Sequence, residues 1–122
     1  MSSKVTFYDS NGAPIAYVAD DCVHIFSFGG SPVGYLARDK VYSFGGRFLG
    51  WFQNGWLYDR SNAPALFTDF AKGGPLKPLK ALKPLKGLKQ LKPLKGLKEL
   101  TPLKPIRSLA WSDISNESYF DQ

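Results

Sequence analysis

The sequence predicts an all-β fold of four β-hairpin repeats, followed by an extended, polyproline-II-like tract. Two observations lead to this prediction: residues 5–68 repeat a strand–turn–strand pattern four times, and residues 75–110 repeat the triplet x-Leu-Lys twelve times. Hydrophobic residues make up 43% of the chain, which contains three tryptophans, six tyrosines and nine phenylalanines. Such a composition is typical of a folded protein, since disordered chains contain few aromatic residues.

The second and third repeats show the internal similarity best. They align at an offset of 16, as FSFGGSPVGYL (residues 26–36) and YSFGGRFLGWF (residues 42–52). The same frame recurs upstream around Asn11-Gly12 and downstream around Ser61-Asn62. Four repeats of this kind predict about eight short antiparallel strands.

Turn residues separate the two strands within most repeats. The dipeptides are Asn11-Gly12, Gly29-Gly30 and Gly45-Gly46. These dipeptides tolerate positive φ at both central positions, so they predict two-residue type I′ turns. The connections between repeats are predicted at Asp20-Asp21, Asp39-Lys40 and Asn54-Gly55. Aspartates at these points, together with Asp9 and Asp59, are expected to bond the turn backbone.

We expect the meander to close into a pseudo-fourfold arrangement, because an open sheet of about eight strands would expose unpaired edges. Several strands are apolar on both faces, which indicates cover on more than one side. A small residue precedes an aromatic one in three repeats, as in Gly50-Trp51, and permits close approach at a common centre. The aromatic row is predicted to form core, with a central ligand pocket as the alternative: Tyr17, Tyr35, Trp51 and Phe67.

The chain resembles the bacterial 4-fold beta flower proteins in three segments: GSPVGYL (residues 30–36), KVYSFGGRFLGWF (residues 40–52) and NGWLYD (residues 54–59). The resemblance covers roughly residues 5–70. It implies four β-hairpin petals without an assigned activity, and it brings no functional residues to carry over.

Residues 75–110 keep a constant residue type in two slots of each triplet. The middle slot is Leu76, Leu79, Leu82, Leu85, Leu88, Leu91, Leu94, Leu97, Leu100, Leu103, Ile106 and Leu109. The third slot is Lys77, Lys80, Lys83, Lys86, Lys89, Lys92, Lys95, Lys98 and Lys104, with Thr101, Arg107 and Ala110 in the remaining positions. The first slot varies and holds six prolines: Pro75, Pro78, Pro84, Pro93, Pro102 and Pro105.

A period of three excludes the common regular structures. In an α-helix the leucines would spiral around the whole surface, and each proline would cost about 3 kcal/mol. In a β-strand, residues three apart point to opposite faces. Polyproline II has three residues per turn, needs no internal hydrogen bonds and tolerates proline, so it aligns all leucines in one stripe. Collagen is excluded because no slot is uniformly glycine.

At about 3.1 Å per residue, a straight tract would reach roughly 110 Å, against about 25 Å for the diameter of the head. We therefore expect it to bend, most easily at Gly87 and Gly96, or to present its leucines to another chain. Exposed leucines are unfavourable in water, so we predict a buried stripe, through self-association or folding back on the head. A flexible low-complexity linker is the alternative.

Charge divides the chain into three parts. Residues 1–74 carry six basic and six acidic residues, residues 75–110 ten basic and one acidic (+9), and residues 111–122 three acidic (−3). We predict a four-hairpin β domain at 1–72, the repeat tract at 73–110, and an acidic, aromatic tail at 111–122. The tail is expected to dock on the basic tract or to cap a head domain, in this subunit or another.

Few residues support catalysis or metal binding. Cys22 and His24 would share a strand face, but residues two apart lie about 6.5–7 Å from each other along a strand, too far for a base–thiol hydrogen bond. Two ligands are too few for zinc. No glycine-rich segment leads into a helix, as a phosphate-binding loop requires. We therefore expect no enzymatic activity, cofactor, metal or small-molecule ligand.

The tract is the predicted partner-binding region of a structural or interaction protein. Nine leucines are expected to drive self-association or to bind a protein partner: Leu76, Leu79, Leu82, Leu85, Leu88, Leu91, Leu94, Leu97 and Leu100. The alternative is binding of nucleic acid or an acidic membrane through Lys77, Lys80, Lys83, Lys86, Lys89, Lys92, Lys95 and Lys98.

A cytoplasmic bacterial location is expected. The single cysteine excludes an intrachain disulfide and fits a reducing compartment. The chain has no apolar run of the roughly 18 residues that a membrane span needs. Its first residues, MSSK, lead into a strand-like stretch instead of the apolar segment of a signal peptide.

Overall fold

The computed structural model describes residues 5–122, in which eight strands form a closed antiparallel barrel. The strands are β1 (Thr6–Tyr8), β2 (Pro14–Val18), β3 (His24–Ser27), β4 (Pro32–Ala37), β5 (Lys40–Tyr42), β6 (Phe48–Gln53), β7 (Trp56–Tyr58) and β8 (Pro64–Phe67). Each strand pairs with the next, and Tyr8 pairs with Phe67 to close the sheet. The predicted all-β fold of four hairpins in a closed meander is confirmed. Residues 1–4, where we expected no signal peptide to begin, lie outside the described residues.

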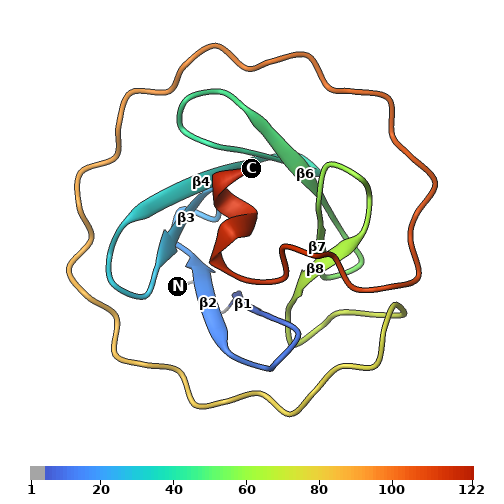
Figure 1. The fold of residues 1–122 in the computed structure, drawn as a ribbon. Helices are drawn as coiled ribbons and strands as arrows, with labels where there is room; N and C mark the ends of the chain where they lie inside the picture. Colours follow the sequence, from blue (N-terminus) through green and yellow to red (C-terminus); the bar gives the residue numbers. More distant parts are fainter. Residues whose placement is uncertain (1–4) are drawn as a thin grey trace.

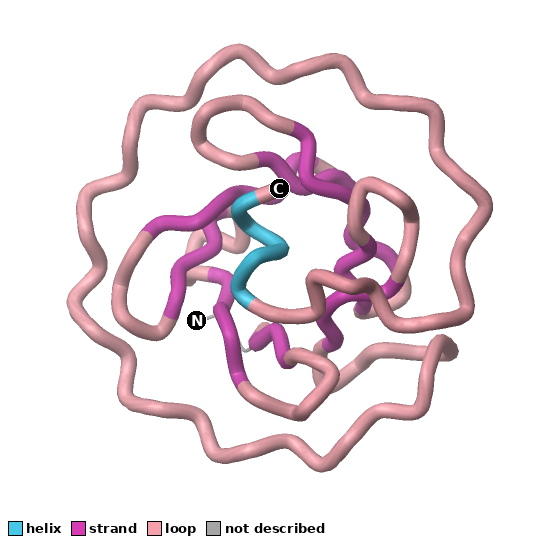
Figure 2. Tube along the Cα trace, in the orientation of Figure 1, coloured by secondary structure: helices cyan, strands magenta, loops and turns pink. Residues whose placement is uncertain are grey.

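The chain forms three layers around one centre, which we name the barrel (residues 5–70), the belt (residues 75–110) and the plug (residues 111–122). Figure 1 shows the belt encircling the four hairpins, after which the plug turns into the centre of the barrel. The plug ends in a short 3₁₀ helix, η1 (Glu117–Asp121). Figure 2 shows no helix or strand in the belt. Polyproline II geometry of the belt and the division into three domains stay predictions.

The hairpin turns differ from the predicted type I′ turns. Positive φ occurs only at the second residue of each predicted dipeptide: Gly12 (83°), Gly30 (103°) and Gly46 (98°). In the first hairpin Gly12 N–H donates to Asp9 O, and Asp9 N–H donates to Ala13 O. This pattern is a three-residue loop, in which a type I turn precedes one left-handed residue. The fourth hairpin follows the same rule with Asn62 at φ 61°.

One side chain in each hairpin bonds the backbone across the turn. The acceptors are Asp9 Oδ1, Ser27 Oγ, Ser43 Oγ and Asp59 Oδ1, each bonded to the N–H four residues later. Hairpins 1 and 4 therefore use aspartate, and hairpins 2 and 3 use serine. The predicted role of Asp9 and Asp59 in turns is confirmed. Both carboxylates bond the backbone of their own turn, which is a structural role.

Each strand sends alternate residues inward and outward. In β7, for example, Leu57 belongs to the interior cluster with Phe7 and Val41, whereas Trp56 and Tyr58 belong to an aromatic cluster outside. The outer clusters also contain Tyr17, Tyr35, Trp51 and Phe67. All four are 2–3% exposed. The aromatic row is therefore core, as predicted, but it lies between barrel and belt and not at the common centre.

The plug completes the interior. Tyr119 is fully buried and donates a 2.9 Å hydrogen bond to Tyr58 O, while Phe120 packs in the same interior cluster. A Cβ on Gly50 would lie 1.8 Å from Tyr58 O and 2.8 Å from the Tyr119 hydroxyl. The small residue before Trp51 thus permits both the strand approach and entry of the plug. Of the two docking sites expected for the tail, the structure shows the cap on its own head domain.

The belt bends, but not at two hinges. Figure 1 shows it curving continuously around the barrel, from residue 75 to residue 110. A length of roughly 110 Å is the circumference of a circle about 35 Å across, which is wider than the roughly 25 Å of the head. The length that exceeds the diameter of the barrel therefore suits its perimeter.

Candidate interaction surface

The belt is fastened to the tips of all four hairpins by backbone hydrogen bonds. Its donors at the four tips are spaced nine residues apart, Ala81, Gln90, Glu99 and Ser108, and they bond Gly12 O, Gly30 O, Gly46 O and Asn62 O at 2.8–3.0 Å. Nine residues are three triplets, so twelve triplets supply four equivalent attachments. The repeat number of the belt thus matches the number of hairpins.

The variable first slot of the triplet follows this attachment pattern. None of the four tip donors is proline, because proline has no N–H to donate. Pro84, Pro93 and Pro102 each lie one triplet after a tip donor, and Pro105 lies one triplet before the last donor, Ser108. Proline therefore occupies first-slot positions other than the four tip donors, and its fixed φ favours an extended chain there.

Gly87 and Gly96 meet the two hairpins that carry a Gly-Gly turn. A Cβ on either glycine would lie 2.4 Å from the carbonyl oxygen of Gly29 or Gly45. Both glycines also donate 2.7 Å hydrogen bonds, to Phe28 O and Phe44 O. The sites predicted as bends are therefore close contacts between backbones, which only glycine allows without displacement.

The lysine stripe faces the barrel. Ammonium groups lie 4.2–6.0 Å from the centroids of outer aromatic rings: Lys77 over Trp56, Lys80 over Tyr8, Lys86 over Tyr17, Lys89 over Tyr17 and Phe26, Lys95 over Tyr35, and Lys98 over Tyr35 and Tyr42. Lys104 lies over Trp51, and the Arg107 guanidinium lies 3.9 Å from the Tyr58 ring. Cations at this distance are attracted to the ring face. The sequence placed lysines and aromatic residues in separate segments, and the fold brings them together.

The third slot has one position after each tip donor that lies over no aromatic ring within residues 5–122. These positions are Lys83, Lys92, Thr101 and Ala110, again nine residues apart, and all four are exposed. The two departures from lysine, at Thr101 and Ala110, therefore occur where no ring requires a cation. At Arg107 the ring is present, and the positive charge is kept.

The acidic residue of the belt, Glu99, ties the belt to the third and fourth hairpins. Its Oε1 accepts 2.6 Å hydrogen bonds from Arg60 Nη1 and from Phe48 N–H. These two bonds, with the Arg60 charge, lower the pKa of the Glu99 carboxyl below its usual value. On the opposite side of the ring, Lys80 pairs with Asp69, which raises the pKa of Lys80.

All twelve apolar residues of the middle slot point away from the barrel. Their exposed fractions are 88–97%, including the nine leucines proposed from the sequence to bind a partner. The prediction of a buried stripe is wrong for this chain by itself. The tract does fold back on the head, but its lysine face lies inward because the barrel presents aromatic rings and turn carbonyls, which suit cations and backbone N–H groups.

Cys22 and His24 do not form a pair. Cys22 lies in the turn before β3 with φ 63°, so the two residues do not share a strand face. His24 Nδ1 instead lies 2.6 Å from Asp21 Oδ2, and its ring stacks on Phe44. Within residues 5–122, no cluster of three or more His, Cys, Asp or Glu side chains could hold a metal ion.

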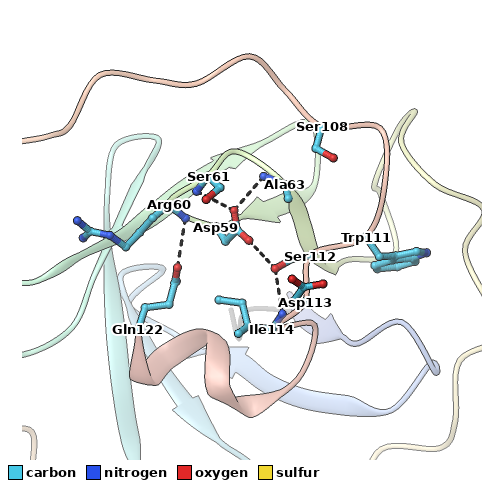
Figure 3. Close-up of a pocket in the computed structure, with 10 residues that line it drawn as sticks. All are labelled: Asp59, Arg60, Ser61, Ala63, Ser108, Trp111, Ser112, Asp113, Ile114 and Gln122. Atoms are coloured by element: carbon cyan, nitrogen blue, oxygen red, sulfur yellow. Dashed lines mark hydrogen bonds between the residues drawn. The ribbon is translucent and has the colours of Figure 1, made fainter.

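A hollow of about 570 Å³ lies beside the fourth hairpin, where the belt joins the plug. Figure 3 shows the Asp59 carboxylate bonded to the turn and to the Ser112 hydroxyl, at 2.5 Å. Arg60 extends away from the hollow toward Glu99, and Gln122 binds the Arg60 N–H. Four polar residues that line the hollow therefore hold the plug and the belt, which favours a structural role: Asp59, Arg60, Ser112 and Gln122.

The residues just before and just after the belt meet at Trp56. The Trp56 indole N–H donates to Lys72 O at 3.1 Å, and the Trp111 ring packs edge-on at 5.4 Å. Gly74 passes against the Trp56 ring, where a Cβ would lie 2.7 Å from it. Sequence reasoning missed this closure, since it depends on residues far apart in the chain. The nine-residue spacing within the belt was present in the sequence and could have indicated four attachment points.

The comparisons with known proteins agree with this architecture. No curated protein and no solved structure matches the chain. No helix within residues 5–122 is long and apolar enough to cross a membrane. A family model described as 4-fold beta flower protein matches residues 5–120, which include the belt and most of the plug as well as the barrel. The chain is therefore a member of the 4-fold beta flower family, a family of small β proteins of unknown function.

Proposed function

We propose that this protein is a non-enzymatic interaction module that associates with itself through the outward leucines of its belt. The observation that carries the proposal is the exposure of twelve leucine-type side chains, 88–97% each, in one closed ring. Soluble monomers rarely expose contiguous apolar surface above a few hundred Å², and larger patches mark interaction sites.

The energetic argument favours a partner. Covering a leucine contributes roughly 1.5–3 kcal/mol, so the whole ring represents on the order of 20–35 kcal/mol. Association costs about 4–15 kcal/mol in lost translational and rotational freedom. Part of the ring is therefore enough to support binding. A second copy offers the same apolar surface, which makes the ring complementary to itself.

The alternative function, binding of anionic surfaces, has less support from the geometry. Six of the eight lysines proposed for it lie within 6.0 Å of an aromatic ring of the barrel. Only Lys83 and Lys92 of that set lie over no ring of the described residues. A nucleic acid or membrane would compete with the barrel for most of the positive charge.

Sedimentation velocity over a wide concentration range tests the proposal. We expect the wild-type chain to associate as its concentration rises. We expect a variant with serine at six alternate ring positions to stay monomeric: Leu76, Leu82, Leu88, Leu94, Leu100 and Ile106. Because these side chains are exposed, the variant should keep the circular dichroism spectrum and unfolding midpoint of the wild type.

A wild-type chain that remains monomeric at every concentration would contradict self-association. Acidic liposomes and single-stranded DNA serve as a second assay at low salt. Binding to either one, weakened by Lys83→Ser with Lys92→Ser and unchanged in the leucine variant, would favour the anionic-surface function instead.

A further inference from the structure

The ring of leucines is uniform, but the charge beside it is not. In the two spans that follow the first and second hairpin tips, Lys83 and Lys92 stand between exposed leucines. In the next span the corresponding residue is Thr101, and after the fourth tip it is Ala110. Residues 100–110 therefore combine the leucine surface with neutral residues at these exposed positions.

The remaining cations of residues 100–110 are engaged with the barrel. Lys104 Nζ lies 5.3 Å from the Trp51 ring centroid and donates a 2.8 Å hydrogen bond to Gln53 Oε1. The Arg107 guanidinium lies over Tyr58 and also bonds Gln53. The neighbouring Glu99 is paired with Arg60. Lys104 and Arg107 keep their charge, but these contacts hold them against the barrel.

We infer that the self-association site is the arc formed by Leu100, Leu103, Ile106 and Leu109, which lacks the ring-free lysine of the earlier spans, and that it pairs with the same arc of a second copy. This inference rests on the proposed function and assigns it to one part of the ring. Two copies meeting through the Lys83 or Lys92 spans would bring like charges together, which opposes association. At this arc, Thr101 and Ala110 stand where the other spans have Lys83 and Lys92, so the apolar side chains of both copies meet with less repulsion.

The expected interface is small. Four leucine-type side chains from each copy cover roughly 500–1,000 Å² in total, below the size of a standard interface. We therefore expect weak, concentration-dependent dimerisation and not a permanent dimer. The curvature of the belt in Figure 1 agrees with this, because two convex rims touch along a limited arc.

Two matched pairs of variants test the arc, with the full chain and sedimentation equilibrium up to about 1 mM, a range suited to weak interfaces. Leu100→Ser with Leu103→Ser should abolish dimerisation, whereas Leu82→Ser with Leu85→Ser should leave the dissociation constant within about twofold. These leucines are equally exposed, at 93–97%. The two pairs flank equivalent positions of the repeat, Lys83 and Thr101. Thr101→Lys should raise the dissociation constant at least tenfold at low salt and less at high salt. Lys83→Thr should not raise it.

The outcomes separate the inference from the proposed function. A monomeric wild type overturns both. If the wild type associates but the Leu82/Leu85 double variant weakens association as much as the Leu100/Leu103 double variant does, the assignment to residues 100–109 is wrong and self-association stands. A Thr101→Lys variant that dimerises like the wild type also overturns the assignment. All variants should unfold at the wild-type urea midpoint, because the substituted side chains contact solvent.

Discussion

The barrel and the belt bury their apolar residues in opposite ways. In the barrel, side chains such as Leu57 and Phe7 are completely buried, and the aromatic residues of the outer face are covered as well. In the belt, every leucine is exposed, and seven of the nine lysines lie over aromatic rings of the barrel. The barrel is therefore held by apolar packing, whereas the belt is held by backbone hydrogen bonds, cation–π contacts and a few ion pairs.

The difference follows from what each layer meets. The inner face of the barrel meets the side chains of the opposite strands and the plug, so apolar packing is available there. The belt meets turn carbonyls and aromatic rings, which pair with N–H groups and cations. A residue's position in the repeat, and not its hydrophobicity, decides which way it points. Leucine is left outside, where 88–97% of each side chain of the middle slot is exposed.

The comparison predicts very unequal costs for the same leucine substitution. Leu57→Ala in the barrel leaves a cavity and should lower the free energy of unfolding by about 2–5 kcal/mol. Leu88→Ala in the belt removes an exposed side chain and should change it by less than about 0.5 kcal/mol. Urea unfolding monitored by tryptophan fluorescence measures both. A cost above 1 kcal/mol for Leu88→Ala would mean that the exposed leucines support the fold.

The plug allows a test of a single hydroxyl. Tyr119→Phe removes the hydrogen bond to Tyr58 O in the buried centre and should cost about 1–3 kcal/mol. Tyr17→Phe is the matched control, because the buried Tyr17 hydroxyl has no hydrogen-bond partner within the described residues. It should be neutral or slightly stabilising in the same urea assay. Equal costs for both variants would show that the Tyr119 hydrogen bond does not hold the plug.

Much of the barrel could be predicted from the sequence, because its determinants are local. The repeat of 16 residues around Gly30 and Gly46 marks the hairpins, and the need to avoid open edges predicts closure. The turn type was predicted wrongly, since Gly-Gly is compatible with both type I′ turns and three-residue loops. Only the register across Ser27 and Ser31 distinguishes them.

The orientation of the belt could not be predicted from the belt alone. Its triplet period places leucine and lysine in separate stripes, but does not say which stripe meets the barrel. Hydrophobicity alone predicts that the leucine stripe is buried. The correct orientation depends on outer aromatic residues such as Tyr17 and Tyr35, which come from other repeats. The nine-residue spacing of Ala81, Gln90 and Glu99 matches their contacts with the hairpins. It can be interpreted as a set of attachment points only when the positions of the hairpins are known.

The attachment of the belt at the hairpin tips gives the next prediction. Gln90→Pro removes the N–H that bonds Gly30 O and should cost about 1–2 kcal/mol, while Gln90→Ala keeps the backbone donor and should be nearly neutral. Ala81 occupies the same slot at the first hairpin, which supports the choice of alanine as control. Urea midpoints compare the two. A proline variant as stable as the alanine variant would show that this bond does not fasten the belt.

The cation–π contacts predict a smaller difference between two lysines. Lys95 lies 4.6 Å from the Tyr35 ring centroid, so Lys95→Met should lower stability by about 0.5–1 kcal/mol. Lys92→Met, one triplet earlier, should have no measurable effect, because Lys92 lies over no ring of the described residues. Repeating the urea titration for both variants measures the difference. Equal midpoints would mean that the inward lysines do not stabilise the belt.

The smallest expected effect is a pH dependence at Glu99. Arg60 and the Phe48 N–H lower the pKa of this carboxyl below its ordinary value of 4.5, so the folded chain binds the proton less readily than the unfolded chain. The stabilisation is therefore complete above about pH 4.5 and is lost as pH falls through the lowered pKa. Glu99→Gln removes this titration, so the decline of the urea midpoint from pH 6 to pH 3 should be shallower in the variant than in the wild type. Parallel declines would show that the Arg60–Glu99 pair adds nothing to the attachment of the belt, and that the backbone bonds and ring contacts hold it alone.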